Sequence, residues 1–147
     1  MNRHYARVVA MQAIYEADFR SDPDIEGIVK RHFSNIGEKG ENSDFTRELV
    51  EKVFLYHEEI DRQIEKVAPE WPIEQVAIID RNILRLAICE MLYFETPPKV
   101  VINEAIELAK TFGSDNSSKF VNGVLGTVYR SLDKYKDEND EQTAENK

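Results

Sequence analysis

The stretch IEQVAIIDRNILRLAICEMLYFE, residues 73–95, decides the fold class. Between Ile78 and Leu92 it is apolar nearly all the way round when it is drawn as a helix at about 100° per residue. A helix with apolar side chains on every side is buried among other elements, because no face of it suits water. We therefore expect a central, buried helix that the rest of the chain surrounds.

The segments on either side of this helix carry amphipathic helical patterns. Helices are expected over residues 3–19, residues 23–33 and residues 45–67, after Pro97 and Pro98, and from about Ser117. In residues 45–67 apolar side chains recur every three or four positions, which is typical of one long helix. Thr96 is placed to cap the helix that starts at the two prolines. We find no convincing strand, so the pattern predicts an all-α chain folded as one compact bundle.

Length and composition are those of an ordinary single-domain globular protein. The chain has 147 residues, of which 41% are hydrophobic and 32% are charged. No apolar run approaches the roughly 20 residues of a membrane span, and the N-terminus lacks the apolar segment of an export signal. Cys89, the single cysteine, lies in an apolar run, which predicts a buried thiol in a cytoplasmic protein. We expect one domain over residues 1–132 and an acidic, disordered tail over residues 133–147.

The charge of the chain is unevenly distributed. A net charge of −9 argues against a protein whose whole surface attracts nucleic acid. The first seven residues nevertheless contain Arg3, His4 and Arg7 and no acid. Any contact with nucleic acid must therefore be a local patch on an acidic body.

The last helix carries two glycines where alanine would hold a helix better. On a helical wheel Gly123 and Gly126 lie with Lys119 and Asn122, opposite an apolar arc that contains residues such as Val124. A smooth strip beside a lysine and an amide would let a backbone or a sugar–phosphate chain approach closely. The alternative is tight packing of small residues against a neighbouring helix. The sequence leaves both interpretations open.

Three motifs resemble those of a known family. They are VINEAIELAKTFGSDNSSKFVNGVLGTV, DRNILRLAICEMLYF and the opening pattern R-x-x-x-R-x-x-A-x-Q-A-I-Y. Over residues 3–132 the chain resembles the bacterial transcription antitermination factor NusB. The resemblance implies about seven helices in two closely packed subdomains. It also implies binding of boxA RNA from ribosomal RNA operons together with NusE, a small-subunit ribosomal protein, in the antitermination complex of RNA polymerase.

The resemblance also assigns site residues. It implies RNA contacts by Arg3, Arg7, Gln12, Tyr15, Lys110, Phe112, Lys119 and Asn122, and NusE contacts by Glu74 and Asp80. Two departures from the family pattern bear on affinity. The opening has Arg3, His4 and Arg7 in place of an unbroken arginine cluster, and Asn116 stands where the family often has an acid. The first should weaken attraction to RNA, and the second should partly offset it.

Several of these residues have a second interpretation from their own helical positions. Tyr15 could stack on a base or belong to the core, and Phe112 could stack or pack at the end of its helix. Arg3 and Arg7 share a face without apolar neighbours, so they are expected to be either solvated or bound to phosphate. Arg81 and Arg85 are expected to pair with acids such as Asp80 or Glu90.

Enzymatic functions find no support in the sequence. The three histidines show no metal-ligand spacing, Cys89 has no activating partner in sequence, and no phosphate-binding glycine loop follows a strand. We therefore expect no cofactor and no catalytic site. The first hypothesis is an RNA-binding antitermination factor. The alternatives are a protein-only helical adaptor and an accessory domain like that of some ribosomal RNA methyltransferases.

Overall fold

The computed structural model describes residues 2–21, 24–34 and 42–132, and these residues form helices and no strand. The elements are α1 (Arg3–Arg20), α2 (Ile25–Ser34), α3 (Ser43–Leu55), α4 (His57–Val67), the 3₁₀ helix η1 (Ile73–Gln75), α5 (Ile78–Tyr93), α6 (Pro98–Phe112) and α7 (Ser117–Ser131). The all-α prediction is confirmed. The predicted acidic tail, residues 133–147, lies outside the described residues. Among the described residues, no helix is both long and apolar enough to cross a membrane.

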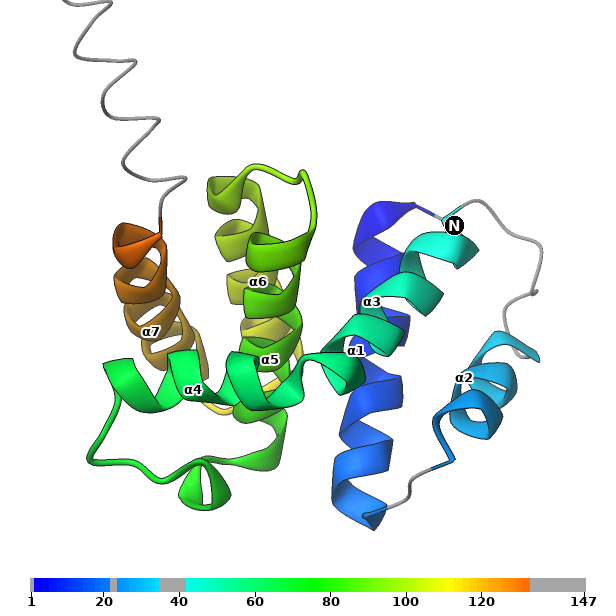
Figure 1. Cartoon of the computed structure of the whole chain (residues 1–147), viewed down its shortest axis with the longest axis horizontal. Helices are drawn as coiled ribbons and strands as arrows, with labels where there is room; N and C mark the ends of the chain where they lie inside the picture. The colour runs from blue at the N-terminus through cyan, green and yellow to red at the C-terminus, as the bar shows by residue number, and fades with distance from the viewer. Residues whose placement is uncertain (1, 22–23, 35–41, 133–147) are drawn as a thin grey trace, which may run out of the picture.

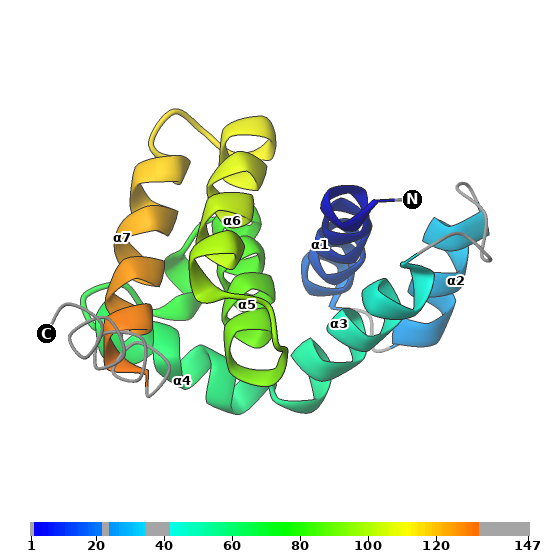
Figure 2. The same ribbon diagram turned by 90° about the horizontal axis from the view of Figure 1, so that it is seen from above.

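Helix α5 is the centre of the molecule, as its sequence predicts. It packs against α1, α3, α4, α6 and α7. Figure 1 shows the resulting arrangement, with α1, α2 and α3 forming an N-terminal lobe and α4, α6 and α7 gathered around α5 in a C-terminal lobe. Seen from above, α6 and α7 lie side by side, well separated from α2 (Figure 2). The buried face of α5 includes Cys89, which is fully buried.

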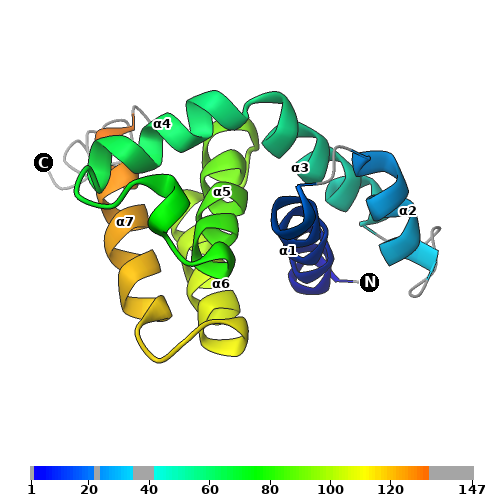
Figure 3. The ribbon, with the colours of Figure 1, turned by 90° about the horizontal axis from the view of Figure 1, so that it is seen from below.

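The long helix expected over residues 45–67 is instead two helices, so that prediction is wrong. The chain breaks at Tyr56, whose backbone angles are φ −109° and ψ 23°. Figure 3 shows α3 and α4 following one another along one edge of the molecule, over both lobes. Helix α3 packs against α1 and α5, whereas α4 packs against α5 and α7. Both helices bury an apolar stripe, so the apolar periodicity of the sequence continues across the break. The break itself follows from the different packing partners of the two helices, which the sequence pattern does not show.

The start of α6 differs from the expected cap. Pro97 holds the N-cap position and Pro98 the first helical position, and no side chain caps the helix. Thr96 is therefore not the N-cap. Pro98 has no N–H to satisfy and its fixed φ suits the first turn, so this helix start has one donor fewer to cap.

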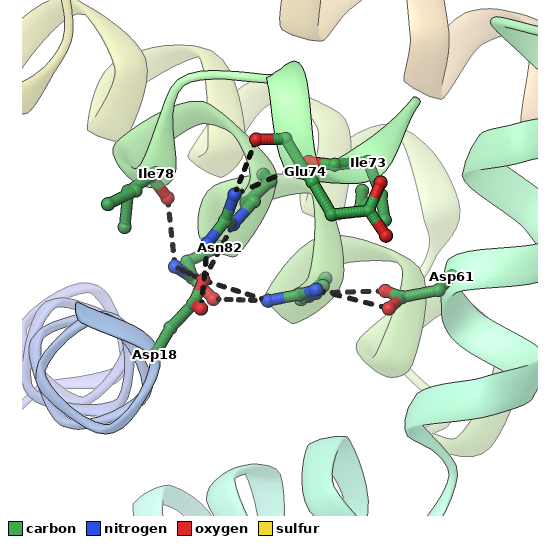
Figure 4. A network of polar contacts seen from close by, with 8 residues as sticks. Asp18, Asp61, Ile73, Glu74, Ile78 and Asn82 are labelled. Atoms are coloured by element: carbon green, nitrogen blue, oxygen red, sulfur yellow. Dashed lines mark hydrogen bonds and ion pairs between the residues drawn. The ribbon is translucent and has the colours of Figure 1, made fainter. Parts of the chain in front are cut away.

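A partly buried polar network ties the two lobes together (Figure 4). Asp18 of α1 accepts hydrogen bonds from Arg81 Nε and Nη2 at 2.7 and 2.8 Å, and from Asn82 Nδ2 at 2.8 Å. Arg85 donates to Asp18 at 3.0 Å and, through Nε and Nη2, to Asp61 of α4 at 2.8 and 3.1 Å. Burial raises the pKa of Asp18, but these hydrogen bonds and charges outweigh it and hold that pKa below its usual value.

These partners are not the ones that the sequence suggested. Arg81 and Arg85 do pair with acids, but with Asp18 and Asp61, not with Asp80 or Glu90. Asp80 directly precedes Arg81 on the same helix, and neighbouring helical positions point in different directions. Glu90 is occupied by a cation from another helix.

Candidate nucleic-acid interface

Arg3 lies at the exposed N-terminal end of α1. Its guanidinium lies over the ring of Phe45, 3.9 Å from the ring centroid, and its Nε donates to Asn42 Oδ1 at 3.1 Å. A cation held on an aromatic face keeps its outer edge free for solvent or an anion. Arg3 is thus a positioned surface charge, as a phosphate contact requires.

Arg7 is buried, which contradicts the expectation of a solvated arginine beside Arg3. Only 6% of its surface is exposed. Its Nε and Nη2 donate to the two carboxylate oxygens of Glu90 at 2.8 and 2.7 Å. Burial alone would lower the pKa of Arg7, but the bonds to Glu90 raise it, so the pair stays ionised. A direct role for Arg7 in holding phosphate is therefore replaced by a structural one.

The same polar cluster reaches α6. Arg7 Nη1 lies 3.8 Å from Glu104 Oε2, and His4 Nδ1 lies 2.8 Å from the same oxygen. One sequence signal pointed to this cluster: Glu90 is an acid in the middle of the most apolar helix. A buried carboxylate is stable only beside a cation, so Glu90 predicts a cationic partner. The sequence did not identify that partner as Arg7.

Three of the predicted RNA-binding residues meet in one place, which we call the aromatic hollow. Its volume is about 700 Å³, and it is lined by Met11, Gln12, Tyr15, Glu16, Phe19, Arg20, His32, Ile79 and Phe112. These residues come from α1, α2, α5 and α6. Gln12, Tyr15 and Phe112 were expected here, but Phe19, Arg20 and His32 were not. The sequence signal for Phe19 is its position one helical turn after Tyr15, which puts two aromatic side chains on the same face of the helix.

The aromatic side chains of the hollow are open to solvent to different degrees. Phe19 is 64% exposed and Phe112 is 38% exposed. Tyr15 packs against the core and also stacks on Phe19, with ring centroids 6.0 Å apart and planes 7° apart. The packing of Tyr15 against the core agrees with one interpretation, and stacking on a base stays a prediction. Phe112 ends α6 with its ring partly in solvent, which suits stacking better than a closed cap.

Glu16 supplies an incompletely bonded carboxylate at this hollow. Its Oε1 accepts from Arg31 Nη1 at 2.8 Å. Its Oε2 is buried and has no hydrogen-bond partner, and the same is true of His32 Nε2, 4.0 Å away. The hydrogen bond from Arg31 and the charge of its guanidinium outweigh the opposing effect of burial and hold the pKa of Glu16 below its usual value, which keeps it ionised. Because Oε2 is buried, it is enclosed by the protein and is not open to the hollow.

A second predicted group lies on the outer face of α7. Lys119, Asn122 and Gly123 are exposed, while Val121, Val124, Leu125 and Val128 are buried. A Cβ added to Gly123 would meet nothing within 4 Å, and one added to Gly126 would meet only Arg130 Nη1, at 3.3 Å. Within the described residues the glycines therefore form no seam with another helix, and the interpretation of tight packing against a neighbouring helix is wrong for this part of the chain.

The remaining predicted residues are placed less favourably. Lys110 is exposed near the end of α6, 3.9 Å from Glu107. Glu74, proposed for NusE, is exposed in η1, and its backbone carbonyl accepts from Arg81 at 3.4 Å. Asp80 is only 9% exposed, and its Oδ1 has no hydrogen-bond partner. Of the two acids, only Glu74 is open to a protein partner.

The structure also describes the histidines and the cysteine that the sequence analysis considered for metal binding and catalysis. Within residues 2–21, 24–34 and 42–132, no group of three or more His, Cys, Asp or Glu side chains could hold a metal ion. Burial raises the pKa of the Cys89 thiol to about 12, so it is a protonated thiol at neutral pH.

Comparison with known proteins decides the family. The model of the NusB family matches residues 4–130. The chain belongs to the NusB family. The transcription antitermination protein NusB of Chloroflexus aggregans is 46% identical over 129 residues, which cover 86% of this chain and 85% of the relative. That of Dehalococcoides mccartyi is 40% identical over 132 residues, or 89% of this chain and 92% of the relative.

Solved NusB structures have the same fold. NusB of T. maritima superimposes with a TM-score of 0.83 at 32% identity, covering 89% of this chain and 92% of the other. A crystal structure of the antitermination factors NusB and NusE in complex with dsRNA matches with a TM-score of 0.80 at 28% identity, covering 90% and 100%. The fold described above is thus the NusB fold.

Proposed function

We propose that this protein is a transcription antitermination factor that binds boxA RNA of nascent ribosomal RNA transcripts together with NusE. The observation that carries the proposal is the match to the NusB family over residues 4–130. The similarity to a NusB chain crystallised with NusE and RNA supports both partners. In this role the protein works in the cytoplasm, without catalysis or cofactor, within the antitermination complex of RNA polymerase.

We assign the proposed RNA contacts to three groups of residues. Arg3, Lys110 and Lys119 are exposed cations for phosphates, and Asn122 adds amide donors beside the smooth strip of α7. Gln12, Tyr15 and Phe112 line the aromatic hollow, where single-stranded bases can stack. Arg7 has an indirect role. Its guanidinium lies 5.4 Å from the centroid of the Phe45 ring, and so helps to position the ring on which Arg3 lies.

NusE is expected to contact Glu74 and to complete the RNA path. A chain with a net charge of −9 attracts RNA weakly over most of its surface, and few cations face the proposed path. A basic ribosomal protein bound beside that path would supply the missing positive charge. Glu74, exposed in η1, is a suitable acidic contact for it.

The decisive experiment is a titration of fluorescently labelled boxA RNA with this protein, with and without NusE, at one salt concentration. We expect NusE to raise the affinity at least tenfold. Equal affinities in the two titrations would contradict the proposed sharing of the RNA between two proteins.

The net charge of −9 also fits an alternative function, a helical adaptor that binds only protein, and the same experiment tests it. A protein-only adaptor would bind NusE through its acidic surface and leave RNA untouched. In that case the protein would bind NusE normally, and NusE would show the same salt-dependent RNA affinity whether or not this protein is present.

A further inference from the structure

Helix α7 carries positive charge and no acid, although the chain as a whole is acidic. Its residues, Ser117–Ser131, include Lys119 and Arg130 and neither Asp nor Glu, whereas the whole chain has 28 acidic residues and a net charge of −9. Both cations are exposed. From helix geometry they lie about 20° apart around the helix axis and roughly 16 Å apart along it. The outer face of α7 therefore has a cation near each end and no negative charge between them.

Arg130 is held in place by neutral groups of its own helix. Its Nη2 donates to Thr127 Oγ1 at 3.1 Å, and that hydroxyl donates to the carbonyl oxygen of Gly123 at 3.1 Å. Gly126 leaves room for the guanidinium, because a Cβ added there would lie 3.3 Å from Arg130 Nη1. The guanidinium is thus positioned against the outer face of α7 while the side chain remains exposed.

The charge of Arg130 differs in this respect from that of the arginines that join the helices. Arg7, Arg81 and Arg85 are each bonded to a carboxylate, which neutralises them. Within residues 2–21, 24–34 and 42–132, no carboxylate forms an ion pair with Arg130. Arg3, the proposed phosphate contact, is likewise held by neutral groups, an aromatic ring and an amide oxygen. A positioned cation without an acid beside it is available to a phosphate.

We propose that Arg130 is a further RNA contact, which binds a phosphate of the nucleotides that flank boxA. The proposal rests on the RNA-binding function above and extends the RNA path along α7. Lys110 and Lys119 lie on either side of the short connection between α6 and α7, and α7 runs from there along the outer edge of the C-terminal lobe (Figure 2). A strand held by these lysines can continue to Arg130. Phosphate contacts carry no sequence information, so the flanking sequence is free to vary.

A purely structural role for Arg130 makes a different prediction. Arg130 lies in the last turn of α7, where a cation stabilises a helix through the helix dipole. The bond to Thr127, however, directs the guanidinium back toward the start of the helix and away from the unpaired carbonyl groups at its end. A role in the helix dipole would affect the free energy of unfolding and leave RNA affinity unchanged.

The test compares labelled boxA RNA with the same RNA extended by about ten uridines on its 5′ side or on its 3′ side. Affinities are measured with NusE present, at four or five salt concentrations. We expect one of the extended RNAs to bind at least threefold more tightly than boxA alone. Arg130→Ala should abolish this advantage. For that extended RNA only, it should also reduce the slope of log affinity against log salt concentration by about 0.7.

Two further variants control for folding and for general loss of charge. Arg62→Ala removes an exposed arginine of α4 that is paired with Glu59, so it should preserve the advantage of the extended RNA. Arg130→Gln keeps a long polar side chain and removes the charge, so it should behave as Arg130→Ala does. If Arg130→Ala does not fold, as judged by circular dichroism, Arg130→Gln takes its place.

The outcomes separate this inference from the proposed function. If boxA alone binds but neither extension raises the affinity, Arg130 contacts no flanking RNA and only this inference fails. It also fails if the Arg130 variants keep the advantage, if they weaken binding of boxA alone equally, or if they weaken binding of NusE in the absence of RNA. If boxA RNA does not bind even with NusE, both proposals fail.

Discussion

Two arginines one helical turn apart on α1 have opposite environments. Arg3 and Arg7 both approach Phe45, at 3.9 and 5.4 Å from its centroid. Arg3 is exposed, whereas Arg7 is enclosed between α1 and α5 and bonded to Glu90. Their similar sequence positions therefore lead to different predictions, one for stability and one for RNA binding.

Removal of Arg7 is expected to destabilise the fold. In Arg7→Ala the carboxylate of Glu90, 1% exposed, is left buried without its cation, and breaking such a pair costs about 3–5 kcal/mol. Chemical denaturation measures the loss directly. Arg3→Ala serves as the control and should change stability by less than about 1 kcal/mol. A similar, small effect of both variants would show that the pair contributes nothing to stability.

Removal of Arg3 is expected to weaken RNA binding at every sequence. Loss of one phosphate contact should reduce the slope of log affinity against log salt concentration by about 0.7 for single-stranded RNA. Titrations at four or five salt concentrations measure that slope. Arg62→Ala removes an exposed arginine of α4 outside the proposed path and should leave the slope unchanged. An unchanged slope in Arg3→Ala would identify Arg3 as a solvated charge.

At the scale of single elements, α7 combines a buried face with an unusually bare outer face. Val121, Leu125 and Val128 are fully buried, so the helix is held in place by its inner side. On the outer side, a Cβ added to Gly123 would meet no described residue within 4 Å. Glycine lowers the stability of a helix relative to alanine, and no packing within the described residues requires it here. Close approach of a partner is the physical reason that remains.

Substitution of these glycines should separate stability from binding. Gly123→Ala has open space for its methyl group, and alanine stabilises a helix by up to about 1 kcal/mol relative to glycine. Gly126→Ala meets only the flexible end of Arg130, so it should also be neutral or stabilising. Both should weaken formation of the complex with RNA and NusE, because a methyl group then projects from the strip. Thermal unfolding and the RNA titration measure the two effects, and more stable variants with unchanged binding would show that nothing approaches this strip.

At the scale of the whole molecule, the network around Asp18 joins the lobes. It links α1 to α5 and α4 through two arginines that share one carboxylate. Few of its atoms lack a partner, which is the condition under which buried ions hold a structure together. The relative position of the lobes, and with it the aromatic hollow between α1, α2, α5 and α6, depends on this arrangement.

The Asp18 network is expected to make stability fall in acid. The folded pKa of Asp18 lies below its ordinary value of 3.8, so its contribution is complete well above pH 4 and is lost as the pH falls through the folded pKa. Asp18→Asn should reduce stability at pH 7 by roughly 3 kcal/mol and flatten the decline below pH 5. Glu59→Gln, which removes an exposed ion pair with Arg62, is the control and should change stability by less than about 1 kcal/mol. Parallel pH–stability curves for Asp18→Asn and the unmodified protein would contradict this assignment.

The sequence by itself determined the all-α class, the central position of residues 73–95 and the outward strip of α7. These follow from the order of apolar and polar residues along single helices, which is local information. The family resemblance added the partners and most residues of the proposed interface, including the three that line the aromatic hollow.

Only the tertiary structure decided which side chains meet. Arg7 and Glu90 are 83 residues apart, and Asp18 and Arg81 are 63 apart, so no spacing in the sequence could pair them. The same holds for the break at Tyr56, where one apolar stripe serves two helices with different neighbours. Tyr15 of α1 and Phe112 of α6 line one hollow because both helices pack against α5. The periodicity of the sequence determines which face of a helix a side chain lies on. Which other side chain it contacts depends on how all the helices pack together.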